Sequence, residues 1–368
     1  QLNTLFYKTS SSGSSPEGDL IQANNGKLYG LMMTEGINNA GTIFEFDIDL
    51  GAFTKLADFT PAVTGENPRG TLIQGSNGKL YGMTQTGGSS DYGVIFEYDI
   101  TGATLNPIHE FVDYLLGAHP HRGALIEQGP GLFVGMVSGG GLAGYGVIFE
   151  FNSTTSNYQT RIDINTKNGY VPHQSLLLAN DGTLYGVTSF GGSYNKGVVF
   201  SYDPGTNTFI NKASFDGASL GSSPKSSLIQ ASNGKIYGTT YDGGINNLGV
   251  IFEYDPIIDT LINLFDFDGA INGQNPSATL LEASNGKFYG VTPQGGTNNV
   301  GVLFEYDPLT DIYINKINFD GASFGSSPYG GLFLSSNNKI YGLTHGGGTF
   351  GSGILFEYDY LSNILLPL

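Results

Sequence analysis

The pattern of apolar and polar positions repeats along the chain in blocks of constant length. Most blocks contain a proline, a short apolar run, the pair Asn-Gly, the sequence Lys-hydrophobic-Tyr-Gly, a Gly-Gly loop and a run such as Gly-Val-Ile-Phe-Glu-Tyr-Asp. The anchoring prolines lie 52 residues apart, at Pro16, Pro68, Pro120, Pro172, Pro224, Pro276 and Pro328. Sevenfold repetition at this period predicts a solenoid, a propeller or an array, in which each copy buries its apolar surface against the next.

The fifth copy shows the elements that are predicted for each block. Apolar and β-branched residues gather in four segments separated by turn residues, at 227–231, 235–240, 250–255 and 260–267. Between the first two segments, Asn233-Gly234 indicates a hairpin with a type I′ turn, because both residues tolerate a positive φ. Four antiparallel strands in a repeat of this length predict one blade of a β-propeller.

Consecutive apolar residues, such as Val250-Ile251-Phe252, predict strands that are covered on both faces, as in blades packed against each other. We therefore expect residues 1–368 to form a single domain, an all-β seven-bladed β-propeller with four antiparallel strands per blade. Residues 2–7 precede Pro16 at the place of a fourth strand, so we expect this N-terminal strand to pair into the last blade and close the ring. Residues 364–368 compete for the same place.

The repeat also carries a family resemblance. In the second copy its core reads Asn77-Gly78-Lys79-Leu80-Tyr81-Gly82-Met83-Thr84, followed by Gly87-Gly88 and by Gly93-Val94-Ile95-Phe96-Glu97-Tyr98-Asp99. This pattern resembles the GloVer tandem repeat, and the resemblance extends over all seven copies and nearly the whole chain. It implies an exported bacterial protein of a family with varied C-terminal anchors. It implies no catalytic residues, since the family has no catalytic motif to transfer.

Composition narrows the classes of function. The chain has 57 Gly, 22 Tyr and 24 Phe but no Cys, and its formal net charge is −17. Because nucleic-acid binding needs clustered Lys and Arg, we expect no nucleic-acid partner. No apolar run is long enough to predict membrane insertion. Since the chain begins at Gln1 rather than Met, we expect a processed protein that is extracellular or at the cell surface of a bacterium.

Several repeated motifs are better explained by blade construction than by chemistry. The Tyr-Gly pairs predict packed aromatic rings beside a glycine that allows close approach. A Lys before the second strand and a Glu on the third are lost together in the fourth copy, which has Thr183 and Ser201, so we expect a cross-strand ion pair. No cofactor is expected, and Asp266-Phe267-Asp268-Gly269 offers only a fragment of a calcium loop.

The copies differ in an informative way at the residue after the anchoring proline. This position should ring the mouth of the central channel, because the first strand of a propeller blade is the innermost. The candidate ligand-binding residues are Arg69, His121, Arg122, His173, Lys225 and Tyr329. A basic arc in an acidic protein favours an anionic ligand, and Arg suits carboxylate or sulfate. The alternatives are solvated residues without a constraint, or a metal ion at His121 and His173.

Three functions remain open from the sequence. The first is a non-catalytic exported or surface module that binds a glycan or a surface partner on the face of the long, variable loops. The second is a polysaccharide-active enzyme, above all a uronate lyase, in which Arg69 or Arg122 neutralises a carboxylate and a His or Tyr329 is the base. The third is a structural or partner-docking disc in a surface assembly. The variable loops on one face favour the binding module.

Overall fold

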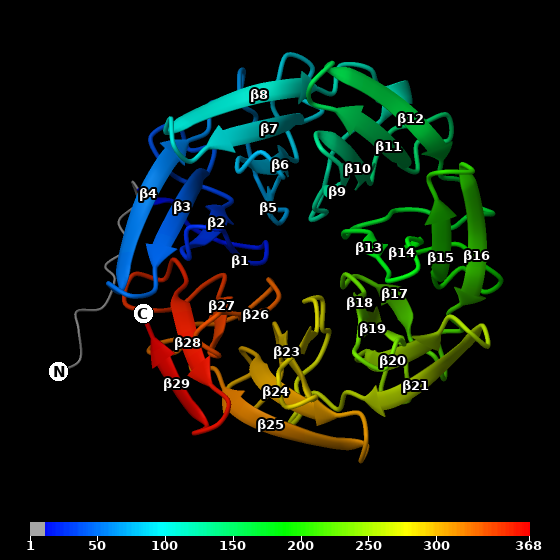
Figure 1. The fold of residues 1–368 in the computed structure, drawn as a ribbon. Coiled ribbons are helices and arrows are strands. Elements are labelled where there is room, and N and C mark those ends of the chain that lie inside the picture. The colour runs from blue at the N-terminus through cyan, green and yellow to red at the C-terminus, as the bar shows by residue number, and fades with distance from the viewer. Residues whose placement is uncertain (1–11) are drawn as a thin grey trace.

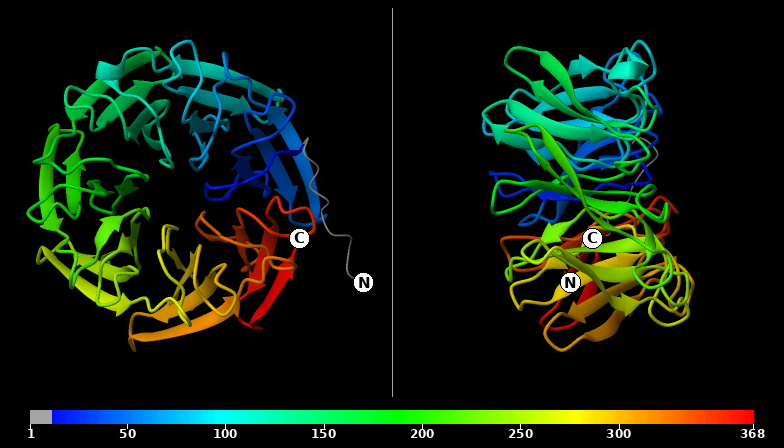
Figure 2. Two further views of the ribbon diagram at one scale, coloured as in Figure 1. Left: turned by 180° about the vertical axis from the view of Figure 1, so that it is seen from behind. Right: turned by 90° about the vertical axis from the view of Figure 1, so that its right-hand side faces the viewer.

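The computed structural model describes residues 12–368 and shows seven blades arranged in a ring (Figure 1). Each blade is an antiparallel sheet whose strands follow in chain order from the ring axis outward, as in β1-β2-β3-β4 of the first blade. Seen from the side, the ring is a thick disc (Figure 2). The all-β seven-bladed propeller that the repeat predicts is confirmed.

The strands nearest the axis are short, whereas the second strands are longer and buried. The first strands are β1 (Ile21–Gln22), β5 (Ile73–Gln74), β9 (Ile126–Gly129), β13 (Leu177–Leu178), β18 (Ile229–Gln230), β22 (Leu281–Glu282) and β26 (Phe333–Leu334). The second strands are β2 (Leu28–Met32), β6 (Leu80–Thr84), β10 (Leu132–Val137), β14 (Leu184–Thr188), β19 (Ile236–Asp242), β23 (Phe288–Thr292) and β27 (Ile340–Leu343).

The third strands form the core of each blade, and the fourth strands form its outer edge. The third strands are β3 (Thr42–Asp47), β7 (Val94–Asp99), β11 (Val147–Asn152), β15 (Val198–Asp203), β20 (Val250–Asp255), β24 (Val302–Asp307) and β28 (Leu355–Asp359). The fourth strands are β4 (Ala52–Asp58), β8 (Thr104–Glu110), β12 (Asn157–Asp163), β16 (Thr208–Ser214), β21 (Thr260–Asp266), β25 (Ile312–Asn318) and β29 (Ile364–Pro367). The fifth blade adds β17 (Ser222–Pro224), and the described residues contain one helical turn, η2 (Tyr114–Leu116).

The first strand is shorter than the sequence predicts. In the fifth blade, β18 comprises two residues instead of the predicted 227–231. Ahead of it, the Ser226 side chain bonds to Thr239 of β19 in place of the backbone, and the Ser175 N–H of the neighbouring blade donates to Ser227 Oγ at 3.3 Å. This innermost segment therefore bonds both to its own sheet and to a neighbouring blade.

The hairpin at Asn233-Gly234 exists, but its predicted turn type is wrong. Only Gly234 has a positive φ, of 82°. The N–H of Ala231 donates to the Lys235 carbonyl at 2.9 Å, and the Gly234 N–H donates to the Ala231 carbonyl at 2.8 Å. These bonds define a three-residue loop that ends in a left-handed glycine. The loop leaves the Asn233 side chain free to accept from the Lys235 N–H and to donate to the Tyr237 hydroxyl.

The repeated polar residues form the cross-strand pairs that the sequence predicts. The Lys Nζ to Glu Oε1 distances are 2.7 Å for Lys27–Glu45, 2.6 Å for Lys79–Glu97, and 2.5 Å for Lys235–Glu253 and Lys287–Glu305. The tyrosine of each such pair is buried and donates to the same Glu, as Tyr237 does to Glu253 at 2.7 Å. In the last blade Lys339 pairs with Asp359 instead. These rings are scaffold and do not form a ladder of ligand sites.

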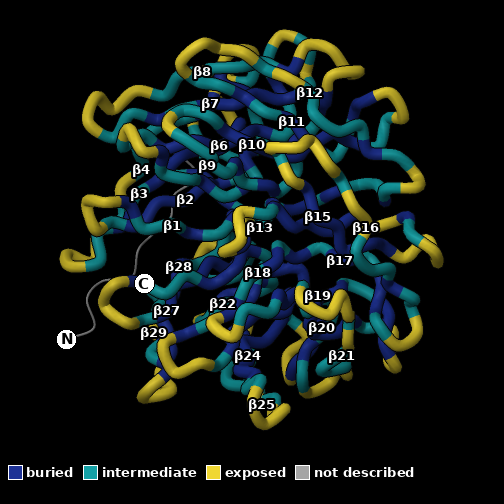
Figure 3. Tube along the Cα trace, turned by 45° about the vertical axis from the view of Figure 1, so that its right-hand side comes forward, coloured by how far each residue is buried: buried dark blue, intermediate teal, exposed yellow. Residues whose placement is uncertain are grey.

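The apolar core lies between neighbouring blades. Figure 3 shows that the buried residues lie inside the disc and that the exposed ones lie mainly in its outer turns. In one cluster, Tyr29 and Ile43 of the first blade pack with Leu80 and Phe96 of the second. The same kind of cluster joins the two ends of the described chain, where Leu28 packs with Tyr341 of the last blade. The expected closing strand at residues 2–7 lies outside the described residues. Within them, the fourth strand of the last blade is β29, which pairs with β28.

Candidate functional site

Every blade brings the residue after its anchoring proline to the ring axis with the same backbone turn. The residue before the proline has a left-handed φ, between 51° and 59°, at Ser15, Asn67, His119, Val171, Ser223, Asn275 and Ser327. Such values are unusual for residues other than glycine, and most of all for β-branched Val171. The turn is held by the preceding blade, as where the Asn275 N–H donates to the Leu248 carbonyl at 2.9 Å.

The proline itself packs on the preceding blade. A Cβ placed on Gly249 would lie 2.9 Å from Pro276 Cδ, so no side chain fits between the two. The left-handed turn and this contact fix the start of each innermost segment. The next side chain therefore points toward the axis with little freedom.

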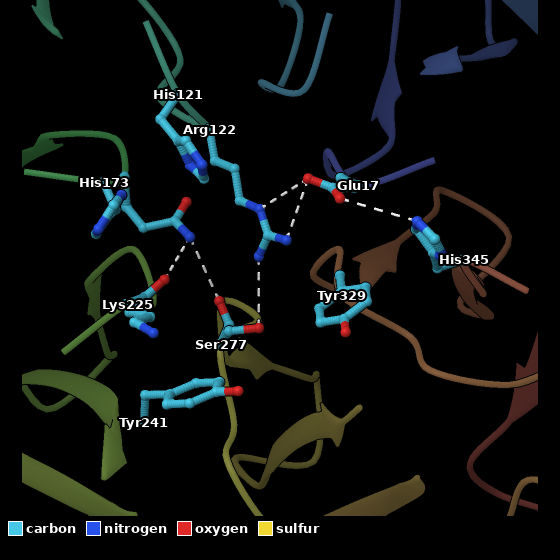
Figure 4. A pocket seen from close by; sticks show the side chains of 10 residues that line it. Glu17, His121, Arg122, His173, Lys225, Tyr241, Ser277, Tyr329 and His345 are labelled. Carbon is cyan, nitrogen blue, oxygen red and sulfur yellow. Dashed lines mark hydrogen bonds and ion pairs between the residues drawn. The ribbon is translucent and has the colours of Figure 1, made fainter. Parts of the chain in front are cut away.

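A cavity of about 340 Å³ lies where these segments converge (Figure 4). We call it the axial pocket. Its lining comes from six of the seven blades and consists of Glu17, His121, Arg122, His173, Gln174, Lys225, Tyr241, Ser277, Tyr329 and His345. It lies at the end of the ring from which the long loops leave, since Tyr241 and His345 stand at the ends of second strands. Its volume is at the small end of the range of ligand pockets.

Five of the six candidate residues line the axial pocket together: His121, Arg122, His173, Lys225 and Tyr329. The sixth, Arg69, is not among the lining residues. Its Nη1 lies 3.5 Å from Oε2 of the lining residue Glu17.

Arg122 spans the axial pocket and joins its two sides. Its Nε donates to Glu17 Oε2 at 3.2 Å, and its Nη2 lies 3.1 Å from the same oxygen. On the other side its Nη1 lies 3.5 Å from Ser277 Oγ. Its guanidinium carbon stands 5.0 Å from the centre of the Tyr329 ring, in a cation–π arrangement. Arg122 reaches this far because the third copy carries one more residue between Pro120 and its first strand than the other copies do.

His121 and His173 are neutral imidazoles at physiological pH. Their rings meet edge to face, with centroids 4.8 Å apart. Burial, reinforced by Lys225 and Arg122, lowers the pKa of His173 to about 4. Burial and the neighbouring His173 and Arg122 lower the pKa of His121 further still. The Nδ1 atoms of both rings are buried, and neither has a hydrogen-bond partner among residues 12–368.

Lys225 is a half-buried cation in the same pocket. Its Nζ lies 3.6 Å from the centre of the Tyr241 ring. Burial lowers the pKa of Lys225, the negative charge of Asp242 opposes this shift, and Arg122 adds to it by a smaller amount. Lys225 does not occur in any ion pair formed within residues 12–368, whereas Arg122 and Arg69 both pair with Glu17.

The innermost segments also bond across the axis next to the pocket. The Asp19 carboxylate accepts from Thr279 Oγ1 at 3.2 Å and from the Gly331 N–H, so one side chain joins the first, sixth and seventh blades. Burial raises the pKa of Asp19, while these hydrogen bonds and Arg122 oppose the rise. The carboxylate is thus occupied in holding the blades together.

Nothing in the described chain gathers the ligands of a metal ion. Across residues 12–368 there is no group of three or more His, Asp or Glu side chains arranged to hold one. At the calcium-like fragment, Asp266 accepts from the Ile245 N–H and Asp268 from the Asn272 N–H. Both carboxylates therefore serve loop structure.

Half of the residues that line the axial pocket are not among those that the sequence predicts. Glu17 and Ser277 follow anchoring prolines, and the rule that identified Lys225 points to them equally. Tyr241 and His345 occupy equivalent positions near the end of the second strand. The ring that each of these two copies carries there is the feature of the sequence that points to them. Gln174 follows His173, and its amide bonds to the Lys225 carbonyl, a contact that no local pattern predicts.

A seven-bladed propeller with a charged pocket on its axis is the class of protein that the fold and the site define. The chain belongs to the Gloeobacter/Verrucomicrobia repeat family, whose model matches residues 1–181 and 172–364. The family resemblance of the repeat core is thereby confirmed. No curated protein matches the chain.

Solved structures with a similar fold share little sequence with this chain. A GH74 enzyme of Niastella koreensis has a TM-score of 0.64 at 14% identity, over 94% of this chain and 52% of that one. An oligogalacturonate lyase in complex with manganese gives 0.62 at 10%, over 94% and 89%. The extracellular domain of a protein described as a one-component system of B. thetaiotaomicron gives 0.63 at 14%, over 94% of this chain and 39% of that one. At these identities the likeness shows the fold alone. None of the helices in residues 12–368 is long and apolar enough to span a membrane.

Proposed function

We propose that the protein is an exported or cell-surface binding module whose axial pocket recognises an anionic group of a glycan. Lys225 carries the proposal: its ammonium lines the pocket, is half-buried and has no ion-pair partner among residues 12–368. A buried cation without a counter-charge is costly, and a ligand anion relieves that cost. Arg122 adds a guanidinium to the same space, with donor groups beyond those that contact Glu17.

The rest of the pocket suits a sugar better than a bare ion. Ser277 and Tyr329 supply hydroxyl groups, and Gln174 supplies an amide. His121 and His173 line the pocket with neutral imidazole rings and so add no charge. Location outside the cell is supported by the family, and by a fold neighbour that is itself an extracellular domain. Protease treatment of intact cells tests the location, since a surface protein is degraded while a cytoplasmic control is spared.

A glycan array tests the binding. The wild-type protein should bind glycans that carry carboxylates and ignore their neutral counterparts. Lys225→Met should lose this binding, whereas Lys167→Met, which removes the same charge from an exposed position outside the pocket, should keep it. Equal binding by all three proteins would contradict the proposal. A protein that binds no glycan but captures a surface protein would favour the partner-docking disc.

A second candidate is a uronate lyase. It is favoured because Arg122 and Lys225, a lysine with a lowered pKa, line the same pocket. In such a reaction a base removes the proton beside the sugar carboxylate, the glycosidic oxygen leaves, and a double bond forms. The low pKa of His173 makes it a weak base at neutral pH, so this role moves to Lys225, whose pKa burial lowers. The fold neighbour that is an oligogalacturonate lyase adds support. Uronate polymers that bind without yielding an ultraviolet-absorbing unsaturated product would exclude the reaction.

A further inference from the structure

Glu17 gives the axial pocket a chemical requirement that is separate from its positive charge. The two oxygens of its carboxylate differ in their surroundings. Oε2 lies within 3.1–3.5 Å of Arg122 Nε, Arg122 Nη2 and Arg69 Nη1. Within residues 12–368, the group paired with Oε1 is His345 Nε2, at 3.9 Å, which is an ion-pair distance for a protonated His345 but exceeds hydrogen-bond range. No hydrogen-bond donor of residues 12–368 reaches Oε1.

A carboxylate oxygen in this position calls for a donor. Although the Glu17 side chain is only 8% exposed, Oε1 is not one of the buried atoms that lack a hydrogen-bond partner, so it faces the pocket, where the donor of a ligand can reach it. An anion cannot serve, since it would meet the negative charge of Glu17. A hydroxyl group can, because it donates without adding charge.

The Lys225 ammonium and Glu17 Oε1 lie on different sides of the pocket. Figure 4 shows Glu17 on one side of Arg122 and Lys225 on the other. Lys225 requires an acceptor, and Glu17 Oε1 requires a donor. Because the pocket holds only about 340 Å³, one small ligand meets both sides.

The charges of the lining limit the charge of the ligand. Arg122 and Lys225 contribute two positive charges and Glu17 one negative charge, while His121 and His173 are neutral. Beyond the lining, Arg69 pairs with Glu17, and Asp242 acts on Lys225 with the opposite sign. One negative charge on the ligand therefore balances the charges of Arg122, Lys225 and Glu17. A second one, as on a phosphate monoester, would face Glu17.

We propose that the axial pocket selects a hydroxy carboxylic acid of the sugar-acid type, whose carboxylate pairs with Lys225 while one of its hydroxyl groups donates to Glu17 Oε1. This inference rests on the proposed function and names the ligand class of the same site. Glu17 is then a specificity-determining residue. It accepts a uronate and rejects both carboxylates without hydroxyl groups and doubly charged sugar esters.

Calorimetric titration with three probes tests the inference. The probes are glucuronate, cyclohexanecarboxylate (a six-membered ring with a carboxylate and no hydroxyl) and glucose 6-phosphate. The wild-type protein should bind glucuronate about tenfold or more tightly than either other probe, as expected for one charge-assisted hydrogen bond. Glu17→Gln keeps the shape but loses the charge, so the preference over glucose 6-phosphate should fall about fivefold or more. Lys225→Met should weaken all three anions, and Lys167→Met none of them.

The outcomes separate the inference from the proposed function. If the wild-type protein binds all three probes equally and Lys225→Met weakens them alike, the pocket is an anion site and the role of Glu17 is wrong. If no probe binds, or Lys225→Met changes nothing, the proposed function fails as well. Should Glu17→Gln not fold, the comparison of the three probes on the wild-type protein decides the matter.

Discussion

Arg122→Met should destabilise the whole ring, although Arg122 lines a pocket. Its side chain is 13% exposed, and it pairs with Glu17, which is 8% exposed. Breaking a buried ion pair by removing one partner costs about 3–5 kcal/mol, because a charge is left without compensation. Arg69 stays 3.5 Å from the same carboxylate oxygen and retains part of the stabilisation. We therefore expect a loss of about 2 kcal/mol in the free energy of unfolding.

A double-mutant cycle isolates the pair. The free energy of unfolding is measured by denaturant titration for the wild-type protein, Arg122→Met, Glu17→Gln and the double variant. Because Glu17→Gln removes the charge that Arg122 neutralises, the double variant should be less damaged than the sum of the single variants predicts. We expect a coupling energy of at least about 1 kcal/mol. The contact of Arg122 with Ser277 is not removed by Glu17→Gln, so it does not enter this coupling.

Two results would refute this reasoning. Arg122→Met with the stability of the wild-type protein would mean that Glu17 is solvated well enough without it. Additive effects of the two single variants would mean that the 3.1 Å contact contributes nothing beyond packing.

Further predictions concern pH, packing and the ion pairs of the blades. His173 has a pKa of about 4 when folded against 6.5 ordinarily, so the unfolded chain takes up a proton first as the pH falls. Its contribution to stability is present above pH 6.5 and is lost between pH 6.5 and 4, and His173→Gln should flatten the melting-temperature profile there. Gly238→Ala places a Cβ 2.6 Å from the Phe252 ring and should cost about 1–3 kcal/mol, measured by denaturant titration. Lys79→Met should cost only about 0.2–1 kcal/mol in the same titration, because its pair with Glu97 is partly exposed.

The repeat predicts the fold because the same apolar runs, turn residues and cross-strand pairs recur from copy to copy. Val250-Ile251-Phe252 is buried on both faces, and the expected pair of Lys235 with Glu253 forms, as do its counterparts in the first, second and sixth copies. The sequence predicts a type I′ turn at Asn233-Gly234, whereas the structure has a three-residue loop, because the sequence does not show which backbone groups bond across the hairpin. The short first strand was missed for a related reason. The partner of Ser227 is in another blade, 52 residues away.

The pocket was predicted in position but not in its contacts. Comparing the residue after each proline identified Lys225 and Arg122, because a fixed backbone turn sends that side chain to the axis. The pairing of Arg122 with Glu17 joins residues 105 positions apart, and it depends on the ring closing. The 52-residue repeat does not show which residues meet across the axis of the ring. The same rule predicts Arg69 in the lining, but Arg69 is not a lining residue and forms an ion pair with Glu17.

A crystal structure of the protein with glucuronate tests the central claim most directly. The proposal predicts ligand density in the axial pocket, with the carboxylate within about 3 Å of Lys225 Nζ and a hydroxyl group at hydrogen-bond distance from Glu17 Oε1. Glucuronate bound outside this pocket, or bound in it with its carboxylate away from Lys225, would contradict the claim.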